Sequence, residues 1–195
     1  TLVWLNAGSR ITYSQGFGVG NRKIELIGEG YFEVKRNEEV PFLVKTNSLL
    51  VKVLGTKFNF RDYPDDAEAI VSLSEGKVAL NNLLKKEKEA FLLPNERVVL
   101  NKKNGRMHVE YSTVSNALQW TNGYLFFDEE LLPDVVKELE RSYNVKIQIA
   151  SDTLNTFRFY GNFVHREQNI QEVLEALSAT RKIHYIIEGH NITLY

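Results

Sequence analysis

The sequence predicts a mainly β first domain followed by a small α+β domain, and two observations support this. Residues 1–112 hold many short runs in which apolar and polar residues alternate, with turn-forming residues between them and no helical spacing. After this region, apolar residues recur at helical spacing between strand-like runs. We therefore expect an antiparallel β-sandwich or rolled sheet over residues 1–112, a linker over 113–120, and a two-helix α+β domain over 121–195.

The first domain is predicted to consist of short strands joined by tight turns. Turns are indicated by glycine, proline, asparagine and aspartate, as at Pro94-Asn95 and Asn104-Gly105. The expected strands are 11–13, 23–27, 31–35, 42–46, 49–54, 57–62, 69–73, 77–80, 90–93 and 96–100. The charged run 85–89 is interpreted as a solvated hairpin tip.

The stretch 50–62 has the most regular pattern of the chain. Its inward positions are predicted to be Val51, Val53, Phe58 and Phe60, which alternate with polar residues. Gly55 and Thr56 interrupt the alternation, and glycine tolerates the backbone of a bulge or turn. We expect a hairpin or a bent strand here, with a structural role and no reactive group.

The second domain is predicted to contain two strand–helix–strand passes with both helices on one face of a mixed sheet. The first pass has strands 123–127 and 145–149 around a helix that begins near Pro133. The second has strand 158–164 and a helix that begins at Asn169, where Glu172 completes a capping box. Strands 183–187 and 192–194 close the chain as a hairpin.

Composition excludes several classes of protein. A net charge of −1 over 195 residues gives no reason to expect nucleic-acid binding. No run approaches the roughly 18 apolar residues that a membrane helix needs. The absence of cysteine excludes disulfides and thiol chemistry. Because the chain opens at Thr1 inside a strand-like pattern, we expect a trimmed or mature fragment.

The sequence contains no recognisable metal-binding or nucleophile motif. His108, His165, His184 and His190 lie far apart, with no second histidine at ligand spacing. The cluster Asp62, Asp65 and Asp66 lacks the spacing of a calcium loop, and no Gly-x-Ser-x-Gly elbow occurs.

Two further patterns resemble catalytic or phosphate-binding sites only superficially. The acidic run 128–130 precedes a helix, whose dipole it is expected to stabilise. The glycines at positions 16, 18 and 20 lack the lysine and helix of a phosphate site. We therefore predict that the protein is not an enzyme and has no metal, cofactor or catalytic residue.

A protein-binding surface is the remaining expectation. The second domain is rich in aromatic residues, of which most are expected in the core and one or two in an exposed patch. The closing strand is a possible uncovered edge that accepts a partner strand. The candidate partner-binding residues are Phe159, Tyr160, Phe163, Ile192 and Leu194.

Several segments resemble FecR-type proteins, the periplasmic sigma-factor regulators of Gram-negative bacteria. The first domain carries the resemblance in five segments that follow the family's order: 3–9, 26–34, 41–46, 53–61 and 73–78. The second domain resembles the C-terminal domain that accompanies FecR domains, and is similar in outline to the short secretin and TonB N-terminal domain. Its matching residues include Trp120, Gly123, Gly161 and Phe163.

The resemblance implies a signalling role. A FecR-type protein has a cytoplasmic segment that contacts an extracytoplasmic-function sigma factor, one inner-membrane helix and a periplasmic region. The family's partner is the signalling domain of a TonB-dependent outer-membrane transducer. We expect this chain to be the periplasmic region, with the sigma-binding segment and the membrane helix outside it. Alternatives are a carbohydrate-binding domain and an envelope-assembly module that forms oligomers.

Overall fold

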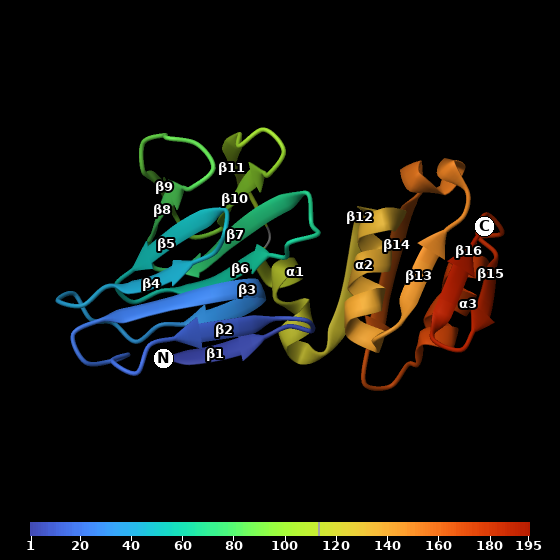
Figure 1. Cartoon of the computed structure of the whole chain (residues 1–195), viewed down its shortest axis with the longest axis horizontal. Helices are drawn as coiled ribbons and strands as arrows, with labels where there is room; N and C mark the ends of the chain where they lie inside the picture. The colour runs from blue at the N-terminus through green and yellow to red at the C-terminus, as the bar shows by residue number, and fades with distance from the viewer. Residues whose placement is uncertain (113) are drawn as a thin grey trace. The chain divides into compact units, whose positions relative to one another are not determined.

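The computed structural model describes residues 1–112 and 114–195 and separates into two compact units, Thr1–Thr121 and Asn122–Tyr195 (Figure 1). The first residue of the predicted linker, Thr113, lies outside the described residues. Among the described residues, no helix has the length and apolar character needed to cross a membrane.

The first unit is built almost entirely from strands, as the alternation predicts. Its strands are β1 (Leu2–Leu5), β2 (Arg10–Tyr13), β3 (Arg22–Glu33), β4 (Phe42–Lys45), β5 (Leu49–Val53), β6 (Lys57–Asp62), β7 (Glu68–Glu75), β8 (Val78–Asn82), β9 (Ala90–Leu92), β10 (Glu96–Asn101) and β11 (Met107–Tyr111). They pair in the order β11-β10-β7-β6-β3-β4-β5-β8-β9, and β1 and β2 also pair with β3. All of these pairs are antiparallel except β3 with β4.

The long strand β3 joins two layers. Its first half, up to Ile27, pairs with β2 and β4, and its second half, from Gly28, pairs with β1 and β6. Gly28 has φ +98°, and a Cβ there would lie 2.4 Å from the Ser9 hydroxyl oxygen. Only glycine fits this turning point without strain. The expected pair of strands 23–27 and 31–35 is therefore one bent strand, and the predicted sandwich or rolled sheet is confirmed.

The core of the first unit lies between these two layers. Buried side chains from β3, β4, β5, β8 and β9 meet those from β6, β7 and β10 in one cluster. Phe32 connects the layers: its ring stacks on Phe58 of β6 at 5.0 Å and contacts Phe42 of β4 at 6.2 Å, centroid to centroid. Rings at such distances contribute beyond their buried area.

The predicted hairpin at 50–62 is wrong in one respect. Strands β5 and β6 do flank Gly55, and their alternate residues are buried, but they do not pair with each other. Strand β5 pairs with β4 and β8, whereas β6 pairs with β3 and β7. Gly55 is needed because a Cβ there would lie 2.6 Å from the backbone of Arg36. Alternation predicts which residues are buried, not which strand is the neighbour.

The end of the first unit contains elements that the sequence pattern did not predict. Strand β11 pairs with β10, and α1 (Val114–Ala117) and η1 (Gln119–Asn122) follow it. Strand β11 escaped prediction because most of its residues are partly or fully exposed. The segment expected to be a linker is thus mostly helical where it is described.

The second unit has the predicted two passes. Its elements are β12 (Tyr124–Leu131), α2 (Leu132–Tyr143), β13 (Lys146–Ile149), η2 (Asp152–Thr156), β14 (Arg158–Val164), α3 (Ile170–Ser178), β15 (Tyr185–Glu188) and β16 (Asn191–Leu194). The strands form two small sheets instead of the single mixed sheet that was expected. Strands β12 and β14 pair antiparallel, and the other sheet has the order β13-β16-β15.

Both helices begin as their sequences predict. Helix α2 has proline in its first turn and buries Leu132, Val135, Val136 and Leu139. Helix α3 begins with the expected capping box: the Asn169 side chain accepts from the Glu172 amide, and the Glu172 carboxylate accepts from the Asn169 amide. Each half of the box satisfies an N–H that the helix leaves open.

The acidic run 128–130 does not lie in the first turn of helix α2. It belongs to strand β12, which has a register shift between Phe127 and Glu130. Glu129 takes φ +55° inside this irregularity. The predicted stabilisation of the helix dipole falls instead to Asp134, in the first turn of α2.

Candidate functional site

A buried carboxylate is the centre of the polar groups of the first unit. The register of β3 and β6 places Glu29 directly opposite Arg61 and places Tyr31 opposite Asn59. Glu29 is only 4% exposed. Its carboxylate accepts hydrogen bonds from Asn6 Nδ2 at 2.9 Å and Asn59 Nδ2 at 2.8 Å, and lies 3.7 Å from the Arg61 guanidinium. A charge at this depth requires such partners.

Trp120 completes this group from the segment expected to be a linker. Its indole Nε1 donates to Asn59 Oδ1 at 3.3 Å. The Asn59 side chain lies on the face of β6 opposite to the hydrophobic core, yet it is buried. Its burial on this outer face is consistent with Trp120 covering it. We call Asn6, Glu29, Asn59, Arg61 and Trp120 the Glu29 cluster. It connects the first strand, the central strands and the end of the unit.

Another aromatic pair lies on the same face of β3. Tyr31 contacts the ring of Trp4 at 5.5 Å between centroids. Burial, and then the negative charge of Glu33, raises the pKa of the Tyr31 phenol above its ordinary value. This phenol therefore stays neutral at physiological pH and acts as a packing group.

The turn after β1 is fixed by the same region. Tyr63 donates its hydroxyl proton to the Ala7 carbonyl at 2.7 Å, and its oxygen lies 3.2 Å from the Ser9 hydroxyl. Ser9 Oγ also accepts from the backbone amide of Glu29 at 2.8 Å. Ala7 and Ser9 of this turn thus serve as hydrogen-bonding partners of β3 and of Tyr63.

Lys102 is a structural residue that sequence reasoning missed. Its ammonium lies 2.6 Å from the buried Asp62 carboxylate and donates to the Tyr63 carbonyl. Asp62 in turn accepts from the Ser48 amide. A lone lysine in a turn gives no sequence signal, because its partner lies 40 positions earlier in the chain.

Replacing Trp120 with phenylalanine tests the cover over the Glu29 cluster. The ring is kept, but Asn59 loses the indole donor, which costs about 1–2 kcal/mol of stability. Urea unfolding followed by far-UV circular dichroism should show this loss in the transition of the first unit. The control is Trp4→Phe, where ring packing on Tyr31 is kept and a smaller change is expected. Equal effects in the two variants would contradict the assigned role.

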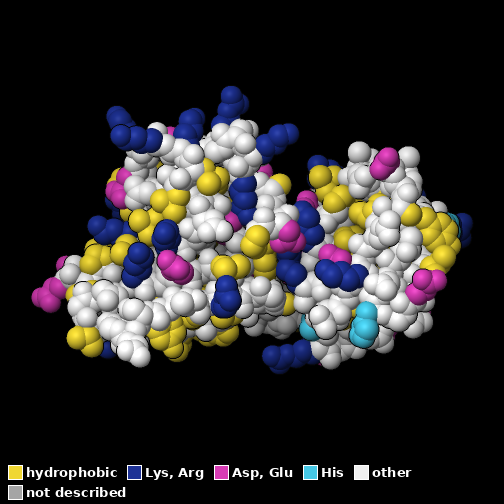
Figure 2. Space-filling view, in the orientation of Figure 1, with side chains coloured by type: hydrophobic (Ala, Val, Ile, Leu, Met, Phe, Trp, Pro, Cys, Tyr) yellow, Lys and Arg dark blue, Asp and Glu magenta, His cyan; other side chains and the backbone are white. Residues whose placement is uncertain are grey.

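Basic side chains gather at one end of the first unit. Figure 2 shows lysines and arginines projecting there, where Figure 1 places the β8–β9 and β10–β11 loops. The end of β8 is joined to the β10–β11 loop, because Asn82 Nδ2 donates to the Gly105 carbonyl at 2.9 Å. Glu87 pairs with Lys85 at 3.1 Å, and this contact lowers the pKa of the Glu87 carboxyl. The charged run 85–89 thus contains both lysine and glutamate side chains at the surface, as expected for a solvated hairpin tip.

Of the five predicted partner-binding residues, four have buried side chains, and the assumption of an exposed surface is wrong for them. Phe159 and Phe163 lie in the core of the second unit, where their rings stack at 6.1 Å and both contact Phe127. Gly161 lies between them on the same face of β14; a Cβ there would lie 2.6 Å from the Phe159 ring. The alternation correctly predicted that Phe159 and Gly161 share one face of β14, and this face packs against the helices.

The closing strand is not an edge. Strand β16 pairs in parallel with β13 on one side and antiparallel with β15 on the other. The side chains of Ile192 and Leu194 are buried in the core cluster of the second unit. Only Tyr160 among the five is exposed, at 59%. A hydrogen bond with Glu129 raises the pKa of its phenol. Tyr160 is thus the one predicted residue with side-chain surface available for a partner.

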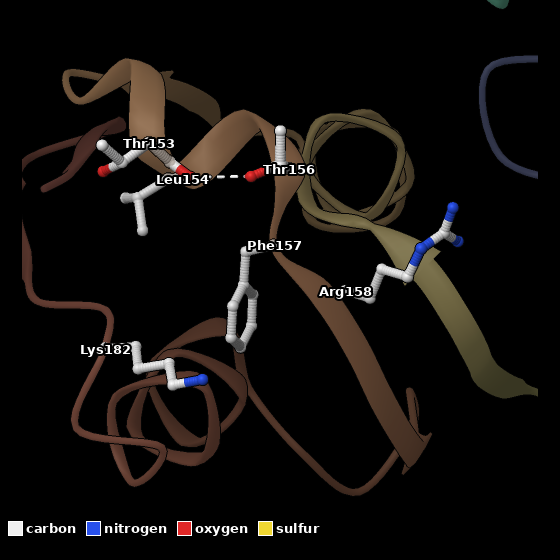
Figure 3. Close-up of a pocket in the computed structure, with 6 residues that line it drawn as sticks. All are labelled: Thr153, Leu154, Thr156, Phe157, Arg158 and Lys182. Carbon is white, nitrogen blue, oxygen red and sulfur yellow. Dashed lines mark hydrogen bonds between the residues drawn. The ribbon is translucent and has the colours of Figure 1, made fainter.

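A shallow pocket opens beside strand β14. It has a volume of about 570 Å³ and is lined by Thr153, Leu154, Thr156, Phe157, Arg158 and Lys182. Figure 3 shows the Lys182 side chain directed toward Phe157 and the Arg158 side chain directed away from it. The Lys182 ammonium lies 5.6 Å from the centroid of the Phe157 ring. The pocket offers the Phe157 ring and the Lys182 ammonium, which are few groups with which to orient a small ligand.

Comparisons with known proteins agree over nearly the whole chain. Two family models match, "FecR protein" over residues 1–79 and "FecR, C-terminal" over residues 124–194. A candidate anti-sigma factor from Parabacteroides distasonis ATCC 8503, solved at 1.65 Å, is 33% identical, with 99% of this chain and 89% of that chain covered and a TM-score of 0.88. This chain belongs to the FecR family. A second crystal structure of a candidate anti-sigma factor from the same organism, at 2.50 Å, gives 33% identity, 99% and 88% coverage and a TM-score of 0.87. No curated protein matches.

The FecR match accounts for most of the Glu29 cluster. Asn6, Glu29, Asn59 and Arg61 all lie within residues 1–79, and they belong to the segments in which the sequence resembles the family. Trp120 lies between the two matched regions. Three of the five FecR-like segments, 3–9, 26–34 and 53–61, therefore contribute side chains to this buried polar group.

Several acidic and histidine side chains in the described part of this FecR-family chain have structural partners. No three side chains among histidine, aspartate and glutamate converge as metal ligands there. His165 contacts the Ser142 carbonyl at 2.9 Å and the Tyr143 ring at 4.8 Å, and therefore supports the end of helix α2. Burial raises the pKa of the Tyr143 phenol, whose hydroxyl donates to the Gln168 carbonyl.

Proposed function

We propose that this FecR-family chain is the periplasmic, signal-receiving region of a single-pass inner-membrane protein that controls an extracytoplasmic-function sigma factor. Its signal is contact with the signalling domain of a TonB-dependent outer-membrane transducer. The sigma factor is contacted by a cytoplasmic segment outside this chain. The role requires two stable units and a recognition surface, and no catalytic step.

The observation that supports the proposal most is similarity over almost the full length. Both family models match in order, and the match to the P. distasonis protein covers 99% of this chain at 33% identity. That protein is described as a candidate anti-sigma factor. Sugar binding is less well supported, because Trp120 is engaged by Asn59 and Trp4 packs on Tyr31.

Titration with the signalling domain of the transducer encoded beside this protein tests the proposal. We expect saturable one-to-one binding by calorimetry, with amide chemical-shift changes concentrated in residues 123–195. Even weak transient partners associate at concentrations on the order of 100 μM. Absence of heat and of shift changes at that concentration would overturn direct contact.

Tyr160→Ala refines the same experiment. If Tyr160 is part of the contact, its truncation weakens binding by about tenfold, as for an exposed aromatic anchor. Tyr13→Ala is the matched control, because Tyr13 is 61% exposed and belongs to the first unit. Equal affinities for both variants and the parent chain would exclude Tyr160 as an anchor.

A further inference from the structure

Strand β15 is the edge of its sheet and is unusually apolar for an edge. In the part of the chain that the structure describes, it pairs only with β16. Ile186 is 50% exposed and Ile187 is 41% exposed. Proteins commonly protect edge strands with lysine, proline or a bulge. Strand β15 has the sequence Tyr-Ile-Ile-Glu and contains neither lysine nor proline.

The hydrogen-bond pattern determines which backbone groups face outward. His184 and Tyr195 exchange both of their backbone hydrogen bonds, at 2.9 and 3.0 Å. Hydrogen-bonded and non-bonded pairs alternate along antiparallel strands. Ile186 and Glu188 therefore direct their N–H and C=O groups toward β16, whereas Tyr185 and Ile187 direct theirs outward. These outward groups can be satisfied by water or by another strand.

The side chains of this edge are complementary to themselves. In an antiparallel pair centred on Ile186, Tyr185 lies opposite Ile187 of the second copy, and these are the residues with outward backbone groups. Ile186 then lies opposite itself, and His184 lies opposite Glu188 of the second copy. Directly opposite residues share a face of the sheet, so an aromatic meets an isoleucine and an imidazole meets a carboxylate.

Other two-fold registers fit less well. Centring on Ile187 places Tyr185 opposite Gly189 and Glu188 opposite Ile186. Centring on Tyr185 requires the outward groups of Ile187 to pair at Ile183, which precedes the strand and is fully buried. Only the register centred on Ile186 keeps every hydrogen-bonded residue within β15.

We propose that the β15 edge pairs with the β15 edge of a second copy of this chain, in the antiparallel register centred on Ile186. The two three-stranded sheets join into one continuous six-stranded sheet through an isologous interface. Strands of four residues bury much less than the roughly 1,200 Å² of stable interfaces. The association is therefore reversible, with a dissociation constant on the order of 100 μM.

Cysteine cross-linking tests the register directly. The chain contains no cysteine, so any disulfide formed by a single introduced cysteine joins two copies. A non-hydrogen-bonded antiparallel pair brings the two Cα atoms to about 4.5 Å, within disulfide range. Under mild oxidation, Ile186→Cys should form covalent dimer several-fold faster than Ile187→Cys, whose exposure is similar. Equal rates, or faster cross-linking at position 187, would overturn the proposal.

Sedimentation equilibrium tests the association without a covalent bond. Ile187→Pro removes an outward N–H and leaves the bonds to β16 in place, as proline at an edge strand allows. The proline variant should dimerise at least about tenfold more weakly than the parent chain. The control Ile187→Ala keeps the backbone N–H of residue 187 and should dimerise more strongly than the proline variant. A parent chain that remains monomeric at several hundred micromolar, on the order of the expected dissociation constant, would refute the pairing.

An exchange of charged residues tests the same register without proline, so it remains informative if the proline variant does not fold. Glu188→Lys places a lysine opposite His184 of the second copy and should weaken the dimer. The double variant His184→Glu/Glu188→Lys restores opposite partners in the same register and should recover association. If the double variant is no better than the single one, the register is wrong. These outcomes do not depend on whether the transducer binds.

Discussion

The Arg61→Met variant is expected to lose about 3 kcal/mol of the free energy of unfolding of the first unit. The Arg61 guanidinium lies between two acidic groups, 2.9 Å from Asp66 and 3.7 Å from the buried Glu29. Glu29 keeps its amide donors Asn6 and Asn59 but loses the attraction of the Arg61 guanidinium. Methionine retains most of the side-chain volume, so the loss is mainly electrostatic.

Tryptophan fluorescence is the measurement, because Trp4 and Trp120 both belong to the first unit. Urea unfolding should shift to a lower midpoint with a nearly unchanged slope. The matched control is Arg97→Met, which removes an ion pair to Glu110 that is much more exposed on both sides. Such pairs contribute about 0–1 kcal/mol. Equal losses in the two variants would show that burial of Glu29 carries no special cost.

Local patterns in the sequence predicted local structure well. Alternation located most strands of the first unit, and the capping box at Asn169 located the start of helix α3. These features depend on residues close together in the chain. The bend at Gly28 appeared in the sequence only as a gap between two predicted strands, because a positive φ has no signal beyond the glycine itself.

Features that depend on distant neighbours were not predictable. Strand β16 lies in the middle of its sheet because it pairs with β13, some 45 positions earlier in the chain. Trp120 packs over Asn59, which the alternation correctly placed on the outward face. A strand pattern identifies two faces but cannot tell which one is covered by an element from elsewhere.

The candidate site failed for the same reason. Phe159 and Tyr160 are adjacent aromatics of similar size, and the sequence offers no means to choose which one is exposed. The choice follows from Gly161 and from helix packing, because the glycine leaves room for the rings of Phe159 and Phe163 to stack.

Phe159→Ala is expected to destabilise the second unit by about 3–5 kcal/mol. The ring is buried between Phe127 and Phe163, and its removal leaves a cavity beside both rings. Tyr160→Ala, one residue along the same strand, removes an exposed ring and should change stability by less than about 0.5 kcal/mol. Both are large truncations on β14, so the comparison isolates burial.

Two readouts separate the units in this comparison. Far-UV circular dichroism should show an earlier transition for Phe159→Ala, whereas tryptophan fluorescence of the first unit should keep the midpoint of the parent chain. A shift in the fluorescence midpoint would show that loss of the Phe159 ring also destabilises the first unit.

The same variants decide how binding data are interpreted. Loss of transducer binding in Phe159→Ala reports unfolding of the second unit, whereas loss in a folded Tyr160→Ala identifies contact surface. If Phe159→Ala remains as stable as Tyr160→Ala, the ring is not part of the core, and the original expectation that Phe159 faces a partner returns.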